Sequence, residues 1–510
     1  MAVALTPRER RALLILVVGI VGVRLLTLAA YPLMDPTEAR YGEIARKMLE
    51  TGNWVMPQFD YGVPFWGKPP LSTWLSAGAM AVLGSNEFAA RLPSLLLMLG
   101  CGALVHALSA QRGGRDAALW AIAIFATTGL VFVAAGAVMT DPALTLGTTL
   151  SMAGFWLAIN SEVPGEPRGE PRRRRLAGSA FFLGLAIGLL AKGPVAVVLT
   201  LVPIGAWTLW TRQWRTVWTN IPWLTGSVLT AVLVVPWYLA AERATPGFLE
   251  YFLVGEHWKR FTQSGWTGDL YGAAHARPRG LIWLLWLGVA LPWSAVALAW
   301  LLRAAMARRE DLRALASDPW SAYFVLWAVT PMAFFTVSGN VLPTYVLPGL
   351  PALALLVGDR WRPSTEAAAT TVDKPVRTAL ATGVVLCTGL IAAAIFLHQR
   401  AESEFSQKAL LRAYTAARVD SAERLFYSAQ QPVSAQFYSG GKATKVIDAA
   451  ALAPYLEDAP RDFLAVRERD LTKLPTPVQA RFAPMGSFGE YRLFRELPPT
   501  SAGGAVAPMR

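Results

Sequence analysis

Hydrophobic and polar positions alternate along this chain in long blocks rather than residue by residue. Apolar runs recur between residues 12 and 398, and short polar segments separate them. A run of about 20 apolar residues is long enough to cross a bilayer as a helix. The pattern therefore predicts an α-helical polytopic membrane domain over residues 1–398, with about eleven to thirteen spans.

Arginines in the short loops predict which side of the membrane each loop occupies. Arginine-rich short loops remain on the cytoplasmic side. With the N-terminus inside, the basic loops at residues 112–115, 162–175, 211–218, 303–319 and 360–377 all fall on that same side. Residues 31–90 and 242–279 then form two large outer loops. Within the first of them, residues 43–49 and 71–83 are predicted to be short helices lying in the interface.

The polar composition after residue 398 indicates a separate unit. Residues 399–497 are predicted to form a small soluble α/β domain outside the membrane, followed by a disordered tail over residues 498–510. The strands expected in this domain are residues 433–438, 445–447, 462–466 and 490–494.

Composition supports the membrane assignment and excludes two other classes. The 510 residues are 54% hydrophobic and only 16% charged, whereas about a quarter of a soluble chain is charged. The net charge of +13 lies mostly in short loops, so it indicates orientation in a bilayer rather than nucleic-acid binding. Cys101 and Cys387 both lie in apolar runs, so neither a disulfide framework nor a zinc site is indicated. The basic start before the first apolar run could also be a signal peptide, but we interpret that run as a retained helix.

Three polar islands at the predicted outer boundary carry candidate chemistry. The first is residues 35–41, with Asp35, Glu38, Arg40 and Tyr41. The second contains Lys68, which the following prolines hold in extended chain, and the third contains Asp141. Ionisable groups at membrane depth are costly, so each is a functional candidate. Each also has a structural explanation: a local ion pair for Glu38, a lysine reaching the lipid headgroups for Lys68, and a helix N-cap for Asp141.

Further cations are expected on the same side of the membrane. Lys192 lies between two short apolar runs, and the second outer loop contains His257, Lys259 and Arg260. Lys192 could serve only to reach the headgroups, and the loop residues could form an exposed face. Together, these islands place acids and cations on one membrane face in a chain without a glycine-rich nucleotide fingerprint. That combination favours a lipid-phosphate-activated sugar donor, whose phosphate the cations would hold while the carboxylates stabilise an oxocarbenium-like transition state or activate the acceptor.

Several motifs resemble a known family. Residues 35–46, Gly52-Asn53-Trp54, Lys68-Pro69-Pro70 and Thr140-Asp141-Pro142 are similar to the protein-mannosyltransferase superfamily of integral-membrane (GT-C type) glycosyltransferases. More narrowly, residues 256–261 and Leu342-Pro343-Thr344-Tyr345 resemble the 4-amino-4-deoxy-L-arabinose lipid A transferases. The resemblance extends over about residues 8–400.

The resemblance implies that a sugar is transferred from undecaprenyl phosphate at the periplasmic face of a bacterial inner membrane. In this branch the acceptor is a phosphate of lipid A, and the product confers polymyxin resistance. A phosphate acceptor is already anionic, so it needs cations more than a general base. No cofactor is implied with certainty, and a divalent metal stays open. The residues to which the resemblance assigns roles are the carboxylates Glu38 and Asp141, with Asp35 in reserve, and the substrate-binding side chains Arg40, Tyr41, Lys68, Lys192, His257, Lys259, Arg260 and Tyr345.

Three positions depart from the family pattern. Thr37 stands where the family usually has an aspartate, Gly67 stands where an acid often precedes the lysine, and Asn340 replaces a lysine. These departures concern the identity of the sugar rather than the reaction class. The alternatives are transfer to another glycan or to protein within the same superfamily, a lipid transporter or flippase, and a receptor-like scaffold. A transporter would carry its charges near mid-span, whereas here they lie at the outer boundary.

Overall fold

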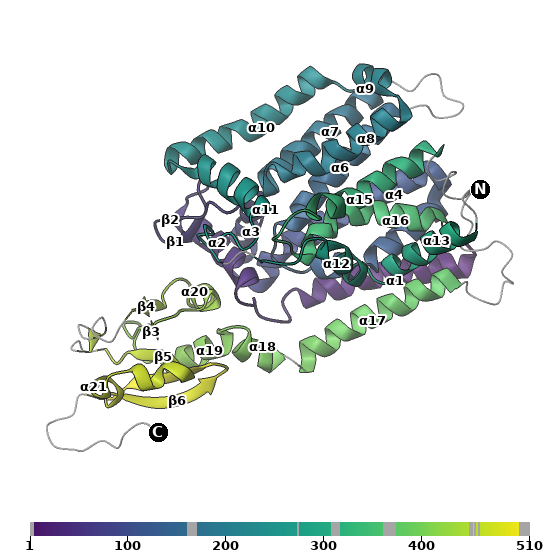
Figure 1. Cartoon of the computed structure of the whole chain (residues 1–510). Coiled ribbons are helices and arrows are strands. Elements are labelled where there is room, and N and C mark those ends of the chain that lie inside the picture. Colours follow the sequence, from purple (N-terminus) through teal and green to yellow (C-terminus); the bar gives the residue numbers. More distant parts are fainter. Residues whose placement is uncertain are drawn as a thin grey trace.

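In the computed structural model, a helical bundle is joined to a small C-terminal α/β domain (Figure 1). The structure describes residues 5–160, 171–272, 275–307, 317–360, 374–396, 398–447, 452, 455–456 and 460–498. The predicted tail after residue 498 and parts of three predicted basic loops lie outside these ranges.

The bundle is built from apolar helices that follow the sequence blocks closely. Its long elements are α1 (Pro7–Thr27), α4 (Glu87–Ala126), α6 (Asp141–Ile159), α7 (Pro171–Lys192), α8 (Val195–Thr211), α10 (Trp223–Ala244), α15 (Pro319–Phe335), α16 (Leu350–Arg360) and α17 (Lys374–Phe396). Shorter elements between them are α5 (Gly129–Ala134), α9 (Trp214–Asn220), η1 (Glu250–Lys259), α11 (Arg260–Thr262), α12 (Leu281–Val289), α13 (Trp293–Ala307) and η2 (Pro343–Gly349).

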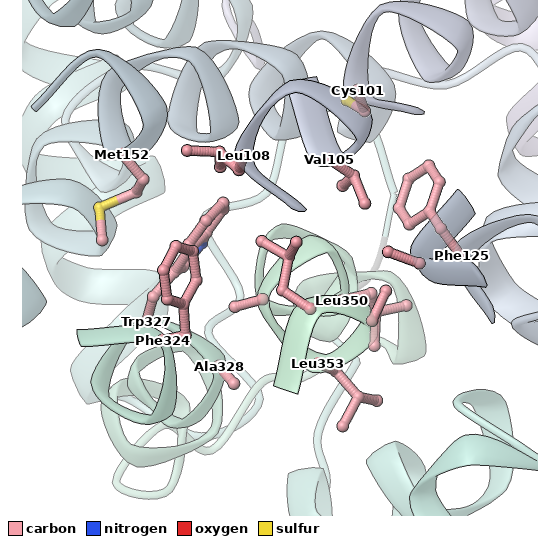
Figure 2. Close-up of a cluster of buried hydrophobic side chains, with 14 of the residues drawn as sticks. Cys101, Val105, Leu108, Phe125, Met152, Phe324, Trp327, Ala328, Leu350 and Leu353 are labelled. Atoms are coloured by element: carbon pink, nitrogen blue, oxygen red, sulfur yellow. The ribbon is translucent and has the colours of Figure 1, made fainter. Parts of the chain in front are cut away.

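The core of the bundle lies where α4, α6, α15 and α16 meet. Figure 2 shows Val105 and Leu108 facing Leu350, with Met152 beside Phe324 and Trp327. Glycines let α6 and α7 approach closely: a Cβ on Gly147 would lie 2.6 Å from the backbone nitrogen of Gly188. Small residues at a helix contact are typical of packing in membranes, where backbones come together for van der Waals contact.

Several helices have the length and composition of membrane spans. Within the described residues, five helices of at least 18 residues are apolar enough to cross a membrane, and the bent pair α12–α13 would make a sixth. Shorter apolar helices such as α3 (Leu71–Leu83) and α8 fall below that length, so this measure does not fix the total number of spans. In α10 and α17 only 22% and 11% of the apolar window is buried by protein. Their outer surfaces therefore suit contact with lipid.

Two breaks in the bundle differ in how well the sequence anticipated them. The predicted turn near residue 112 is a kink at Gly114, whose φ of 77° lies in the left-handed region. The span predicted over residues 280–302 is not one continuous helix, because α12 and α13 are separate helices bent by 114°. Leu291-Pro292 lies at that bend, and a proline cannot supply the backbone N–H that a continuous helix needs.

The basic ends of several helices meet at one end of the bundle. Arg10 contacts Asp116 at 2.9 Å, Arg112 contacts Asp318 at 2.9 Å, and Arg174 contacts Asn220 at 3.2 Å. These contacts join α1, α4, α7, α9 and α15, and Figure 1 places the N-terminus and α9 at this side. We call it the arginine-rich end.

The opposite end carries the first large polar loop. It contains α2 (Thr37–Thr51), the hairpin β1 (Gln58–Asp60) and β2 (Val63–Pro64), and α3 (Leu71–Leu83). The predicted helix over residues 71–83 has the same limits as α3. The helix predicted over residues 43–49 starts six residues earlier, directly after Pro36, so Glu38, Arg40 and Tyr41 lie in its first turns. A proline is well tolerated at a helix start because the N–H there has no helical partner.

The C-terminal domain contains a five-stranded mixed sheet. Its strands are β3 (Leu425–Ser428), β4 (Thr444–Val446), β5 (Phe463–Arg467), β6 (Phe482–Phe488) and β7 (Tyr491–Glu496), in the spatial order β4-β3-β5-β7-β6. Strand β3 pairs in parallel with β4 and β5, and β7 is antiparallel to its neighbours. The remaining elements are α18 (His398–Glu404), α19 (Lys408–Ala417), α20 (Val433–Ser439), η4 (Glu468–Lys473) and α21 (Thr476–Gln479).

One predicted strand was wrong. Residues 433–438 form helix α20, which follows Pro432 and ends at Gly440 with a φ of 63°. A short apolar run does not distinguish strand from helix by its period alone, whereas proline before a helix and glycine after it are ordinary helix limits.

The C-terminal domain is held against the polar loop through α20 and α19. The hydroxyl of Tyr438 accepts from the backbone of Leu33 at 2.7 Å and donates to Glu87 at 2.9 Å. Lys408 contacts the same Glu87 carboxylate at 2.6 Å, and Lys47 donates to Gln436 at 3.2 Å. The domain therefore packs directly over α2, which carries the first island.

Candidate active site

The second polar island meets the second large loop at a compact charge cluster. Lys68 and Arg260 both contact the carboxylate of Glu256, at 3.3 Å and 3.0 Å. Arg260 also contacts Asp269 at 3.1 Å. Glu256 is only 5% exposed, while Lys68 and Arg260 keep 21% and 17% of their side-chain surface. We call Lys68, Glu256, Arg260 and Asp269 the phosphate cluster, after the ligand that the sequence predicts for its two cations, which stay accessible while its acids are buried.

The pKa shifts of Lys68 and Glu256 keep both side chains in their charged forms. Burial alone would lower the pKa of the Lys68 ammonium, but the Glu256 carboxylate raises it above its ordinary value. Burial would likewise raise the pKa of Glu256, and Lys68 with Arg260 lowers it. Lys68, Arg260 and Glu256 are therefore charged at neutral pH, and two cations are presented to a ligand.

The third island supplies a second ion pair. Asp141 begins α6 and Lys192 ends α7, and their charged atoms lie 2.6 Å apart. Both side chains are largely buried, with 9% and 12% exposed. The ammonium of Lys192 also lies 4.8 Å from the ring centre of Tyr345. Tyr345 also lies within electrostatic range of Lys68 and Arg260, so it lies between the two groups of charges.

His257 positions the turn that carries Lys192. One ring nitrogen lies 2.7 Å from the carbonyl oxygen of Phe252, and the other lies 3.1 Å from that of Lys192. Burial lowers the pKa of His257, so the neutral ring donates one of these two hydrogen bonds. It belongs to η1, a π-helix, and such wide turns are frequent at functional sites.

Replacing Gly193 by alanine is expected to reduce activity by displacing this turn. Gly193 has a φ of 78°, and a Cβ there would lie 2.6 Å from the Phe252 ring and 3.2 Å from the His257 ring. Gly205→Ala is the matched control, because a Cβ at Gly205 meets nothing within 4 Å. Both variants would be purified and their turnover compared. Equal loss in the two variants would contradict the positioning role.

Glu38, the first choice of catalytic carboxylate from the sequence, forms an ion pair with Arg91, and its catalytic role stays a prediction. Its two oxygens accept from Arg91 at 2.7 and 2.8 Å, and from the backbone of Met34 and Val138. Arg91 has no exposed surface and donates also to three backbone carbonyls. The Glu38 carboxylate is thus engaged by donors that tie the polar loop to α4. The sequence left open a local ion pair for Glu38. The structure shows instead a long-range ion pair between Glu38 and Arg91.

Asp35 contacts the C-terminal domain. Its carboxylate accepts from the backbone N–H of Ser434 at 2.9 Å and from the Ser434 hydroxyl. Burial raises the pKa of Asp35, against the effect of these hydrogen bonds. The geometry gives Asp35 a partner at the start of α20, so it helps to hold the domain, and its reserve role beside Glu38 stays a prediction.

The other expected residues fall into two groups. Tyr41 packs edge-on against Phe65 and acts on the pKa of Lys68, and Arg40 lies over the Phe59 ring. Tyr41 therefore borders the phosphate cluster, whereas the contact of Arg40 is with the aromatic residues beside it. Lys259 is exposed at the end of η1.

The structure shows what surrounds Gly67 and Asn340, two of the positions that depart from the family pattern. A Cβ on Gly67 would lie 3.0 Å from the Phe65 ring, so aromatic packing fills the space beside Lys68. The side chain of Asn340 donates to the backbone carbonyls of Arg260 and Gln263, both at 2.6 Å, and thereby fixes the end of α11.

Sequence reasoning missed the acids of the phosphate cluster and the Arg91 anchor. Glu256 and Arg260 are four residues apart, a spacing that lets helical side chains pair, so a signal for that pair was present. The contacts of Arg91 and Asp269 depend on tertiary structure. Among the described residues, no group of three or more His, Cys, Asp or Glu side chains could hold a metal ion.

Comparisons with known proteins agree with the fold. The family model described as dolichyl-phosphate-mannose-protein mannosyltransferase matches residues 11–252. ArnT from Cupriavidus metallidurans bound to undecaprenyl phosphate superposes with a TM-score of 0.76 at 17% identity, covering 96% of this chain and 99% of that one. Its apo state gives a TM-score of 0.72 at 18% identity, covering 95% and 97%. The chain is accordingly a multi-pass membrane protein with the GT-C fold, as the sequence predicted.

Within this class, the chain is similar to the aminoarabinose transferases. It is 34% identical over 357 residues to undecaprenyl phosphate-alpha-4-amino-4-deoxy-L-arabinose arabinosyl transferase 1 of Pseudomonas fluorescens, covering 69% of this chain and 58% of that protein. The corresponding transferase of Erwinia tasmaniensis is 32% identical, with 65% and 56% covered. The chain thus matches little more than half the length of these relatives. The resemblance expected from the motifs is confirmed.

Proposed function

We propose that this protein transfers a sugar from undecaprenyl phosphate to an anionic acceptor, with 4-amino-4-deoxy-L-arabinose as the sugar and a lipid A phosphate as the acceptor. The phosphate cluster beside Tyr345 carries this proposal. Lys68 and Arg260 present two accessible cations whose orientation is fixed by Glu256, as a lipid phosphate requires. The relatives named above act on this donor according to their names.

The reaction exchanges one phosphate for another at the anomeric carbon. An oxygen of the acceptor phosphate forms a bond to the anomeric carbon. At the same time the bond between the anomeric carbon and the donor phosphate oxygen breaks. The electron pair stays with undecaprenyl phosphate, whose growing negative charge Lys68, Arg260 and the Tyr345 hydroxyl stabilise. The acceptor already carries its charge, so no proton has to be removed from it. In this proposal Asp141, which contacts Lys192 at 2.6 Å, stabilises positive charge on the sugar.

An apolar cavity supports a lipid-linked donor. It has a volume of about 850 Å³ and lies between α12, α13, α15, α16 and α17, with Trp283 and Trp286 in its wall. Helix α12 also packs against η2, which contains Tyr345. A polyprenyl chain in this cavity would therefore lead toward the phosphate cluster. Burial of a long hydrocarbon chain supplies binding free energy that a small charged headgroup cannot.

We propose that the arginine-rich end faces the cytoplasm and that the active site and C-terminal domain face the periplasm of the inner membrane. Basic helix ends gather on one side in the manner of the positive-inside rule. The opposite end of the bundle carries the acids and cations of the candidate active site, which a lipid substrate in the periplasmic leaflet would contact.

Replacing Lys68 by alanine is expected to lower the transfer rate by about 10²–10³-fold, because one donor to the leaving phosphate is lost. Lys442→Ala is the matched control, since Lys442 is an exposed lysine of the C-terminal domain outside the candidate site. The assay would use purified protein in liposomes with the undecaprenyl-phosphate sugar and lipid A, and would follow modified lipid A by mass spectrometry. Unmodified lipid A with the unaltered protein would refute this donor–acceptor pair, and equal rates for the two variants would refute the role of Lys68.

A further inference from the structure

Asn340 lies where the turn before Tyr345 meets the loop that carries Arg260, and only 4% of its surface is exposed. Its side-chain amide donates to the carbonyl oxygens of Arg260 and Gln263, both at 2.6 Å, and accepts from the backbone N–H of Gly265 at 3.0 Å. A side-chain amide has two N–H donors and one acceptor oxygen. Both donors and the oxygen are therefore bound to one segment, which lies 75 to 80 positions earlier in the chain.

These hydrogen bonds cap the end of helix α11. The last carbonyl groups of a helix have no N–H partner within the helix, so another group has to supply one. The amide of Asn340 supplies two such donors. The neighbouring Gly339 packs tightly on the same turn, because a Cβ there would lie 2.6 Å from the Cβ of Ser264. Residues 339–340 are thus closely fitted to the turn of residues 263–265.

The turn of residues 263–265 lies between the two acids that hold the guanidinium of Arg260. Glu256 precedes the turn and contacts Arg260 at 3.0 Å, whereas Asp269 follows it and contacts Arg260 at 3.1 Å. The position of the turn therefore decides where Asp269 stands relative to Arg260. Lys68 contacts Glu256, the acid on the near side of the turn. A displaced turn would consequently disturb Arg260 more than Lys68.

Aromatic contacts support the same region without Asn340. The rings of Phe261 and Phe334 stack with their centres 4.6 Å apart, and the rings of Phe335 and Tyr345 have centres 4.5 Å apart. The end of α15 thus packs against both α11 and the turn that carries Tyr345. Because these apolar contacts remain when Asn340 is replaced, we expect the loop to stay attached and the protein to fold.

We propose that Asn340 is a positioning residue, which fixes the place of Arg260 in the phosphate cluster through the backbone of α11. This role rests on the proposed function, because it requires that Arg260 binds the phosphate of a lipid-linked donor. Asn340→Asp is the sharpest change. It keeps the shape of the side chain and an acceptor for Gly265, but it turns an oxygen toward the two carbonyl groups that now accept hydrogen bonds.

The test is binding of farnesyl phosphate, a short polyprenyl phosphate, to the full-length protein in nanodiscs. Calorimetry would measure the affinity, with empty nanodiscs as the blank. Asn340→Asp is expected to weaken binding by about tenfold, because a charged donor to the phosphate is misplaced. In a protein that already carries Arg260→Ala, the same change should have no further effect. In a protein that carries Lys68→Ala, it should again weaken binding by about tenfold.

Asn86→Asp is the matched control for this exchange. The amide of Asn86 also donates to a backbone carbonyl and accepts from a backbone N–H, at the start of α4. Aspartate serves as well as asparagine at a helix start, so the affinity for farnesyl phosphate should not change. Asn340→Ala, which removes the donors without adding a charge, is carried through the same comparison and decides the matter if Asn340→Asp does not fold.

The outcomes separate this role from the proposed reaction. Unchanged affinity in the Asn340 variants, or the same loss with and without Arg260, would overturn the positioning role, and sugar transfer by the unaltered protein would still support the proposed function. If Arg260→Ala alone leaves the affinity unchanged, the phosphate role of Arg260 fails and the positioning role fails with it. If the affinities change as expected but the unaltered protein transfers no sugar, only the proposed function fails.

Discussion

Replacing Arg91 by methionine is expected to destabilise the protein by about 3–5 kcal/mol, because Glu38 would be left as a buried carboxylate without its partner. Arg91 has no exposed surface and also satisfies three carbonyl oxygens of residues 28–32. Thermal unfolding of the purified protein would measure the loss. Arg115→Met, at an exposed position of the same helix, is the control and should change stability little.

The same pair tests what Glu38 does. If Glu38 is an anchor, Glu38→Gln and Arg91→Met should each lower stability, and the double variant should lose less than the sum of the two. Transfer activity would then fall in proportion to the folded fraction. A Glu38→Gln protein that is fully stable yet inactive would instead restore Glu38 as a catalytic carboxylate.

Asp141→Asn is expected to lower the transfer rate by about 100-fold or more while the protein remains folded. The change leaves Lys192 without its carboxylate at 2.6 Å, so both the charge facing the sugar and the position of the lysine are altered. Rates at saturating donor and the donor concentration at half-rate would be measured separately. A role in the transition state predicts that the maximal rate falls while donor affinity changes less.

Asp116→Asn provides the matched control for that experiment. Asp116 also forms an ion pair, with Arg10 at 2.9 Å, but at the arginine-rich end. Its loss should leave the transfer rate within a factor of two or so, as expected for an exposed ion pair. Comparable losses in both variants would mean that Asp141 acts through stability alone.

Much of the architecture could be predicted from sequence because the responsible forces are local. Apolar blocks of sufficient length defined the helices, and the limits of α3 were predicted exactly as observed. The errors occurred where local signals conflict or are weak. Proline in the run of residues 280–302 separated α12 from α13, and the short run at residues 433–438 carried no decisive period.

The site was predictable as a set of residue types but not as a set of pairs. Lys68, Lys192, Asp141 and Arg260 stood out because charge is costly beside a membrane. Which acid neutralises which cation depends on contacts between residues far apart in sequence. Lys68 meets Glu256 across 188 positions, and Glu38 meets Arg91 across 53. The sequence therefore singled out Glu38 by its charge, but it could not show that Glu38 pairs with Arg91.

The packing of α20 over α2 has a consequence for any attempt to divide this protein at residue 398. A fragment ending there would lack Ser434, Tyr438 and Lys408, and would leave Asp35 and Glu87 without those donors. The fragment would also lose Phe437 and thereby uncover Leu33 and Ala39, which belong to the same buried cluster. The compositional boundary in the sequence is thus not a boundary of cooperative folding, and the soluble part acts as an integral wall of the membrane part.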